Sequence, residues 1–323
     1  MTTFFDKRHG RRRTLGLLWA TAIVGSLPQT AAAQHQRLLR IGFQKYGTLT
    51  LLKVRGILAR RLAPLGITVS WSEFPAGPVL LEALNVGSID YGTVGEAPPI
   101  FAQAAGADLL YVGNEPASPK SEAIVVQRDS HLRSVADLKG RKVVLNKGSN
   151  VHYLLVRALE HAGLAYTDVQ TVFLPPADAR AAFERGSVDA WVIWDPFLAA
   201  AEKQLGARVL VDGSGLVSNR QFFLAARGYA EKNPDVLQLI QEELAKVDQW
   251  AQQNPQQVAI ALAAQTGLDA SVLELAARRF TYGVQPVSPA VLTEQQRIAD
   301  SFAALKLIPK PINVRAALPV QKS

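Results

Sequence analysis

Short apolar runs alternate along this chain with longer runs that have apolar residues at helical spacing. Residues 38–43 and 67–71 are apolar or β-branched, which is typical of strands. Between them, residues 51–62 form an amphipathic run ended by Pro64 and Gly66, as expected of a helix. This alternation predicts an α/β fold with largely parallel sheets. Further strands are predicted at residues 89–94, 109–112, 122–127, 142–145, 169–173, 209–211 and 221–226, and further helices at 78–87, 98–105, 151–161, 234–252, 255–265, 270–278 and 289–305.

One strand–helix–strand unit occurs twice. The sequence Gly-Ser-Ile-Asp at residues 87–90 recurs as Gly-Ser-Val-Asp at residues 186–189. Each copy follows a helical run and precedes a strand-like run that ends in an acidic residue and proline. Because two copies so far apart cannot form a solenoid, they predict two similar lobes with a site between them.

The chain is predicted to cross twice between these lobes. Residues 115–119 and 212–215 are rich in proline, glycine or serine and are typical of connecting segments. We therefore expect a discontinuous first lobe, residues 34–117 with 218–323, and a continuous second lobe, residues 118–217. Two connections form a natural hinge, so the lobes are expected to close around a ligand in a central cleft.

The first 33 residues are predicted to be a signal peptide. A basic segment that includes Arg12 and Arg13 precedes a short apolar run, and three alanines at residues 31–33 then fit a cleavage site. The paired arginines are compatible with both general secretion (Sec) and twin-arginine export. No cysteine is present to carry a lipid anchor, so the exported chain is expected to be soluble in a periplasm.

Composition and charge narrow the function further. Residues 1–33 contain five Lys or Arg and one Asp, so removing them lowers the formal net charge from +8 by 4 to +4. This mild positive charge suits an anionic ligand, and no basic run with interleaved aromatic residues suggests nucleic acid. The exported chain would also contain no sulfur, since its one methionine is Met1. Either avoidance of oxidisable groups or synthesis under sulfur scarcity would explain the lack of sulfur.

Two helix starts are candidates for an anion site. Gly148 allows a ligand close to the backbone, and Ser149 is a good N-cap for the helix that follows. Ala76 and Gly77 form the matching helix start in the other lobe. Facing each other across a cleft, two such N-termini would bind an anionic head group with few cations. An ordinary serine-capped helix is the alternative for residues 148–149.

Two acidic residues occupy equivalent positions in the repeat. Glu96, which follows Gly95, and Asp195 each end a strand-like run. They could recognise a hydrogen-bond donor on the ligand. Alternatively, Asp195 simply caps a helix that begins at Pro196.

Three further residues are candidates for the cleft wall. Gln44 ends the first strand, where open α/β sheets bind ligands. Trp191 and Trp194 point to opposite faces of one strand, and Trp194, at the strand end, is the better candidate for the cleft. Phe74 is equally compatible with the core and with the cleft wall.

The sequence contains no catalytic pattern. It has no G-x-S-x-G, G-x-G-x-x-G or P-loop sequence, and its histidines do not pair with each other or with carboxylates at metal-ligand spacing. We therefore expect a protein that is not an enzyme, without catalytic residues, metal or cofactor.

Long residue strings at 74–90, 98–113, 136–140, 147–149, 176–183 and 188–196 carry a family likeness. Through them the chain resembles the aliphatic-sulfonate-binding proteins of ABC importers, within a wider group that binds taurine, nitrate and related small anions. The likeness covers nearly all of the chain after the predicted signal peptide and weakens beyond about Asn233.

The resemblance implies a two-lobed, hinge-closing periplasmic binding protein fold of type II. It also implies a monomer that delivers a small anionic ligand, such as an alkanesulfonate, to a membrane permease and its ATPase for sulfur acquisition. Ligand contacts would lie at Gln44, Ala76-Gly77, Gly95-Glu96, Gly148-Ser149 and Trp194-Asp195. An aspartate is expected where Glu96 stands, so the pocket for the ligand tail should differ here.

Three other functions are compatible with parts of the pattern. A receptor of the same class could bind sulfate esters, aromatic sulfonates or nitrate. An enzyme on the same fold would be expected to have a cytoplasmic chain and a Cys- and His-rich active region, and both are absent. A sensory domain would present the ligand to a receptor instead of a transporter.

Overall fold

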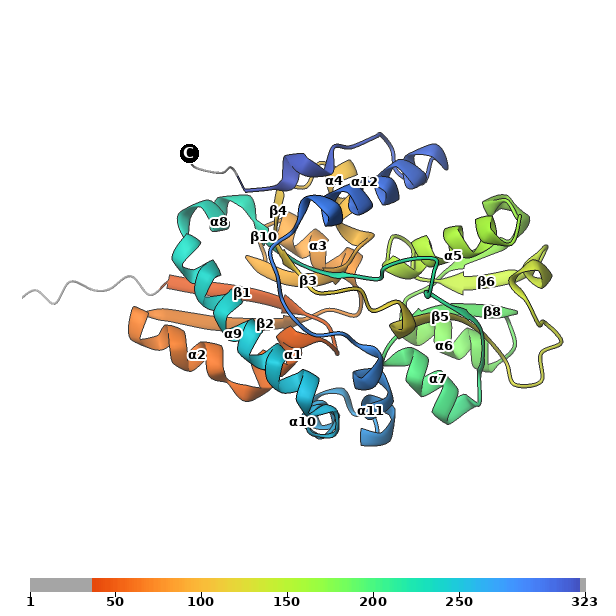
Figure 1. Cartoon of the computed structure of the whole chain (residues 1–323), viewed down its shortest axis with the longest axis horizontal. Helices are drawn as coiled ribbons and strands as arrows, with labels where there is room; N and C mark the ends of the chain where they lie inside the picture. The colour runs from red at the N-terminus through yellow and green to blue at the C-terminus, as the bar shows by residue number, and fades with distance from the viewer. Residues whose placement is uncertain (1–36, 320–323) are drawn as a thin grey trace, which may run out of the picture. The chain divides into compact units, whose positions relative to one another are not determined.

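The computed structural model describes residues 37–319, which form two five-stranded sheets covered by helices (Figure 1). The predicted α/β fold is therefore confirmed. The predicted signal peptide, residues 1–33, lies outside the described residues. Within the described part of the chain, no helix is long and apolar enough to cross a membrane.

The strands and helices follow the predicted alternation. The strands are β1 (Arg37–Phe43), β2 (Ile67–Glu73), β3 (Tyr91–Gly95), β4 (Leu109–Asn114), β5 (Glu122–Val126), β6 (Lys142–Leu145), β7 (Gln170–Phe173), β8 (Ala190–Trp194), β9 (Arg208–Asp212) and β10 (Gln221–Ala226). The helices are α1 (Thr48–Arg55), α2 (Ile57–Leu62), α3 (Gly77–Asn85), α4 (Pro98–Ala104), α5 (Asn150–His161), α6 (Pro176–Glu184), α7 (Phe197–Leu205), α8 (Arg227–Lys232), α9 (Pro234–Gln253), α10 (Pro255–Thr266), α11 (Ala270–Arg279) and α12 (Pro289–Ala304).

One predicted helix is divided. The amphipathic run at residues 51–62 forms α1 and α2, because Gly56 adopts a left-handed conformation with φ of 60° and ends α1. Helix α1 also begins earlier than predicted, at Thr48. Helix α1 therefore begins only a few residues after β1 in the sequence.

Both sheets follow the same plan. The first has the order β2-β1-β3-β10-β4, and the second has the order β7-β6-β8-β5-β9. In each sheet one strand runs antiparallel to both neighbours, β10 in the first and β5 in the second. These are the first strands after each crossing between the sheets, so the sheets are mixed and not wholly parallel.

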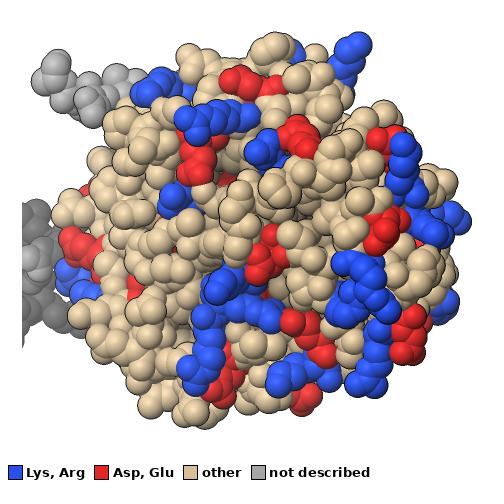
Figure 2. Space-filling model, turned by 45° about the vertical axis from the view of Figure 1, so that its right-hand side comes forward, with Lys and Arg blue, Asp and Glu red and all other residues tan. Residues whose placement is uncertain are grey.

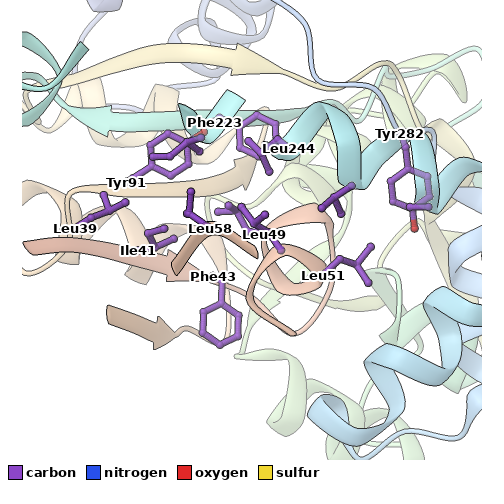
Figure 3. Packing of buried hydrophobic residues seen from close by; sticks show 14 of the residues in the cluster. Leu39, Ile41, Phe43, Leu49, Leu51, Leu58, Tyr91, Phe223, Leu244 and Tyr282 are labelled. Atoms are coloured by element: carbon purple, nitrogen blue, oxygen red, sulfur yellow. The ribbon is translucent and has the colours of Figure 1, made fainter. Parts of the chain in front are cut away.

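Each face of the first sheet has its own core. On one face, Leu39 and Ile41 of β1 and Tyr91 of β3 pack against Leu49 of α1 and Leu244 of α9 (Figure 3). These side chains are fully buried, and each stabilises the fold by roughly 1.5–3 kcal/mol. Helices α3, α4 and α12 cover the other face. The second sheet is covered by α5 on one face and by α6 and α7 on the other.

The glycines of the repeated sequence end equivalent helices. Gly87 and Gly186 have φ of 71° and 69°, in the left-handed region that glycine adopts readily. The N–H of Gly87 donates to the carbonyl of Leu84 (3.1 Å), and that of Gly186 donates to Phe183 (3.0 Å). The two turns thus lead into β3 and β8 in the same way.

The aspartates of the repeated sequence join each new strand to its neighbour. Asp90 Oδ2 accepts the backbone N–H of Arg40 in β1 (2.8 Å), and Asp189 Oδ2 accepts that of Lys142 in β6 (2.8 Å). In both cases the aspartate N–H donates back to the carbonyl of the same partner residue, at 2.7 Å and 2.8 Å. The repeat is therefore a structural device that sets the register of β3 and β8.

The two crossings between the sheets are hydrogen bonded to each other. The N–H of Ser118 donates to the carbonyl of Ser218 (3.0 Å). Asn219 Nδ2 donates to the carbonyl of Ser118 (3.0 Å) and to Ser121 Oγ (2.9 Å). The lobe boundaries at residues 117–118 and 217–218 remain a prediction.

Helix α11 contacts the second sheet's helices, although its neighbours in sequence pack on the first sheet. Val272 and Ala276 of α11 form a small buried cluster with Ala199 and Ala200 of α7.

On the molecular face shown in Figure 2, basic and acidic side chains lie interspersed.

Candidate ligand-binding site

A cavity of about 260 Å³ is lined by residues that follow strands of both sheets. The carboxyl ends of parallel strands are where open α/β sheets bind ligands. The first sheet contributes Gln44 after β1 and Gly95 at the end of β3. The second contributes Ser149 after β6 and Trp194 at the end of β8.

Several helices begin at residues of the cavity lining. Those that start with a residue other than proline and lack a side-chain cap are α1 after Gly47, α3 at Gly77 and α5 after Ser149. The first backbone N–H groups of a helix have no intrahelical acceptor, and the helix dipole makes this end positive. The cavity therefore has backbone donors suited to an anion from both sheets.

Ser149 does not cap α5 in the predicted way. Its hydroxyl donates to the carbonyl of Asn146 (2.7 Å) and accepts no bond from the helix. The first N–H groups of α5 are consequently not occupied by this side chain.

Of the ten predicted site residues, six line the cavity and four do not. Those that line it are Gln44, Gly77, Gly95, Ser149, Trp194 and Asp195. Those outside the lining are Phe74, Ala76, Glu96 and Gly148. Phe74 packs with the core of the first sheet, and Ala76 is buried as the N-cap residue of α3.

Gly148 shapes the turn before α5. Its φ is +75°, and an added Cβ would lie 3.3 Å from the ring of Phe101. Its N–H donates to Nδ1 of His152 (3.3 Å), and Nε2 of His152 lies 2.7 Å from the hydroxyl of Tyr166. The Gly148 N–H is thus already bonded within the protein, and glycine is needed here for its backbone conformation.

Glu96 holds the end of the second crossing. It is buried, and its Oε2 accepts the N–H of Arg220 (3.1 Å). Its backbone carbonyl accepts Nε2 of Gln295 in α12. Burial raises the pKa of Glu96 to about 7, and the charge of Glu294 adds to this rise.

Asp195 both lines the cavity and caps α7. Its Oδ1 accepts the N–H of Ala199 (2.9 Å) and lies 3.5 Å from Nη1 of Arg279. Burial raises the pKa of Asp195 to about 7, against the opposing effect of Arg279. The arginine offsets the negative charge beside the cavity.

Glu115 is a second acidic residue in the lining. The hydroxyl of Thr48 is hydrogen bonded to both Glu115 and Asp248. A hydroxyl has only one proton to donate, so one of the two carboxyl groups must supply the other. Burial and the nearby Asp248 raise the pKa of Glu115 well above its ordinary value. A protonated Glu115 would not repel an anion.

Several lining residues were not predicted, among them Asn150, Asn219 and Phe280. Asn150 Nδ2 donates to Asn219 Oδ1 (2.7 Å) and to a carboxylate oxygen of Glu122. Asn150 could have been found as the neighbour of Ser149, and Asn219 adopts a positive φ of 47°, which asparagine tolerates. No local pattern marks Phe280. Among the described residues, no group of His, Cys, Asp or Glu could hold a metal ion.

Comparisons with known proteins identify the family of this chain. The model of the NMT1-like family matches residues 32–266. A relative from Escherichia coli (strain K12), which has the provisional name aliphatic sulfonates-binding protein, is 47% identical over 306 residues. That alignment covers 94% of this chain and 95% of the relative.

Two solved structures are similar over most of the chain. The alkanesulfonate-binding protein SsuA from Xanthomonas axonopodis pv. citri, bound to MOPS, is 45% identical with a TM-score of 0.84, covering 87% of this chain and 98% of that one. The periplasmic aliphatic sulphonate binding protein SsuA from Escherichia coli is 48% identical with a TM-score of 0.79, covering 87% and 97%. These matches confirm the expected periplasmic binding protein fold, and both proteins are named for binding and not for catalysis. The chain therefore belongs to the NMT1-like family and is a relative of the aliphatic-sulfonate-binding proteins.

Proposed function

We propose that this chain is the periplasmic receptor of an ABC importer, which captures an organosulfonate and delivers it for sulfur acquisition. The observation that carries the proposal is a cavity onto which the uncapped starts of α1, α3 and α5 open. The names of the similar proteins support it.

Backbone N–H groups explain how the site selects an anion. Lys45 is the one basic residue of the described chain in the cavity lining, so the binding of an anionic head group depends mainly on helix N-termini. Two of the acidic lining residues do not oppose this, because Asp195 is paired with Arg279 and the pKa of Glu115 is raised. The third, Glu73, is exposed to solvent.

The rest of the lining favours an anion with a carbon tail. Trp194, Phe197 and Phe280 line the same cavity as the helix starts. Nitrate and inorganic sulfate have no apolar part that such side chains could bury. The lack of sulfur in the chain after Met1 is consistent with synthesis under sulfur scarcity.

The proposed partners follow from this role. The receptor would act as a monomer, exported by its predicted signal peptide, and would present the closed, ligand-bound form to a permease driven by an ATPase. We expect no cofactor and no nucleic-acid partner.

Isothermal titration calorimetry of the exported chain tests the proposal. Ethanesulfonate, taurine, methyl sulfate, benzenesulfonate, nitrate and sulfate would be titrated in turn. We expect one-to-one binding of at least one sulfonate, with no measurable heat from nitrate or inorganic sulfate. Binding of nitrate alone, or of methyl sulfate but no sulfonate, would overturn the sulfonate assignment.

A further inference from the structure

The cavity lining combines two kinds of side chain, polar and aromatic. Asn150, Asn219 and Ser121 are joined by hydrogen bonds and lie next to the start of α5. The Cβ position of Gly95 lies 2.7 Å from Asn150 Oδ1, so the end of β3 adjoins this polar group. This polar group, together with the start of α5, is suited to the anionic head.

Four aromatic side chains line the same cavity. Tyr46 and Phe280 meet edge to face with ring centroids 5.6 Å apart, and Trp194 and Phe197 do the same at 6.0 Å. The two pairs are brought together by Arg279, which directly precedes Phe280 and lies 3.5 Å from Asp195, the residue after Trp194.

Phe280 is held firmly in this position by the segment that follows α11. The N–H of Thr281 donates to Ser118 Oγ (2.9 Å), and that of Val284 donates to Asp248 Oδ2 (2.7 Å). Gln285 pairs with Asn114 at the end of β4. A side chain fixed in this way can discriminate between ligands, since little of its own freedom is lost on binding.

We propose that Tyr46, Trp194, Phe197 and Phe280 form a tail subsite, and that this protein prefers sulfonates with a ring in the tail over short linear alkanesulfonates. The inference rests on the proposed function. Aromatic side chains arranged in edge-to-face pairs present flat faces and edges that complement a planar or cyclic group. A two-carbon tail would leave most of the aromatic side chains of this subsite without a contact to the ligand.

Calorimetry with three probes measures the preference. Ethanesulfonate has a minimal tail, while hexanesulfonate and benzenesulfonate have the same number of carbon atoms in linear and cyclic form. We expect benzenesulfonate to bind about tenfold more tightly than ethanesulfonate, and more tightly than hexanesulfonate. If ethanesulfonate binds as tightly as benzenesulfonate, the tail subsite is wrong although the sulfonate function stands. If no sulfonate binds, both proposals fail.

Phe280→Leu tests the subsite directly, because it removes the ring and keeps an apolar side chain. The ratio of the two dissociation constants should fall to about one, because benzenesulfonate loses far more affinity than ethanesulfonate. Equal weakening of both ligands would show a structural role only and would overturn the inference. Phe197→Leu is a second variant in the same wall with the same expected result. Phe183→Leu is the control, since Phe183 packs on Trp191 away from the cavity lining and should leave the ratio unchanged.

Discussion

The close contact between Gly95 and Asn150 joins the two sheets at the polar group of the cavity lining. A Cβ on Gly95 would lie 2.7 Å from Asn150 Oδ1, closer than real Cβ atoms approach. Asn150 is the first residue of α5 and is bonded to Asn219 in the second crossing. A single methyl group at Gly95 would therefore displace the start of α5 from the site.

Gly95→Ala should weaken sulfonate binding at least about tenfold, because α5 can no longer present its first N–H groups in the same place. The measurement is calorimetry with the tightest sulfonate found for the unmodified protein. Gly228→Ala is the matched control, since no atom lies within 4 Å of its Cβ position and no residue of α8 lines the cavity. Unchanged affinity in Gly95→Ala would remove Asn150 and α5 from the site.

At the scale of elements, the two copies of the repeat have the same geometry, but their aspartates accept different numbers of hydrogen bonds. Asp90 accepts three bonds from Arg40: one from its backbone N–H, one from Nε (2.9 Å) and one from Nη2 (2.6 Å). Asp189 accepts only the backbone N–H of Lys142. Asp90 is also buried, while Asp189 is partly exposed.

Asp90→Ala should therefore lower the free energy of unfolding by about 2–3 kcal/mol, and Asp189→Ala by only about 1 kcal/mol. Urea unfolding followed by circular dichroism would measure both. Ligand affinity should stay unchanged in each variant, because neither residue lines the cavity. An equal loss in the two variants would contradict the assignment of extra stability to the Arg40 pair.

At the scale of the whole molecule, several buried carboxyl groups make stability depend on pH. Burial raises the pKa of Glu96 and of Asp195 to about 7, and that of Asp248 to about 6. It also raises the pKa values of Glu115 and Glu122. The folded state thus keeps protons that the unfolded chain releases above about pH 4. The free energy of unfolding must fall as the pH rises from about 4 to about 7, and Glu96, Asp195 and Asp248 change it little above that range.

The ligand-free protein should accordingly resist urea better at pH 5 than at pH 8. Glu96→Gln replaces one of these titrating carboxyl groups with a neutral amide. It should reduce the difference in the free energy of unfolding between pH 5 and pH 8 by about 2–3 kcal/mol. Urea titrations of both proteins at the two pH values measure this effect. A protein that is equally stable at pH 5 and pH 8 would show that these carboxyl groups are not buried as described.

Local pattern was sufficient to predict most of the elements and part of the site. The alternation of apolar and amphipathic runs located the strands and helices, because a side chain's face depends on neighbours two to four residues away. The exceptions were residues 51–62, where a single glycine at position 56 divides the helix, and α8, which lies in none of the predicted ranges. Six of the ten predicted site residues line the cavity because they stand at strand ends and helix starts, which are local features.

By itself, the sequence determined the α/β fold, the internal repeat with its glycine turns, and the helix starts that open onto the cavity. Only the tertiary structure decided which groups face a ligand. Phe280 enters the lining from the far end of the chain, and the Gly148 N–H and the Glu96 carboxylate are bonded within the protein instead. These outcomes depend on packing between segments far apart in sequence, such as Arg279 against Asp195, and no short-range periodicity records such contacts.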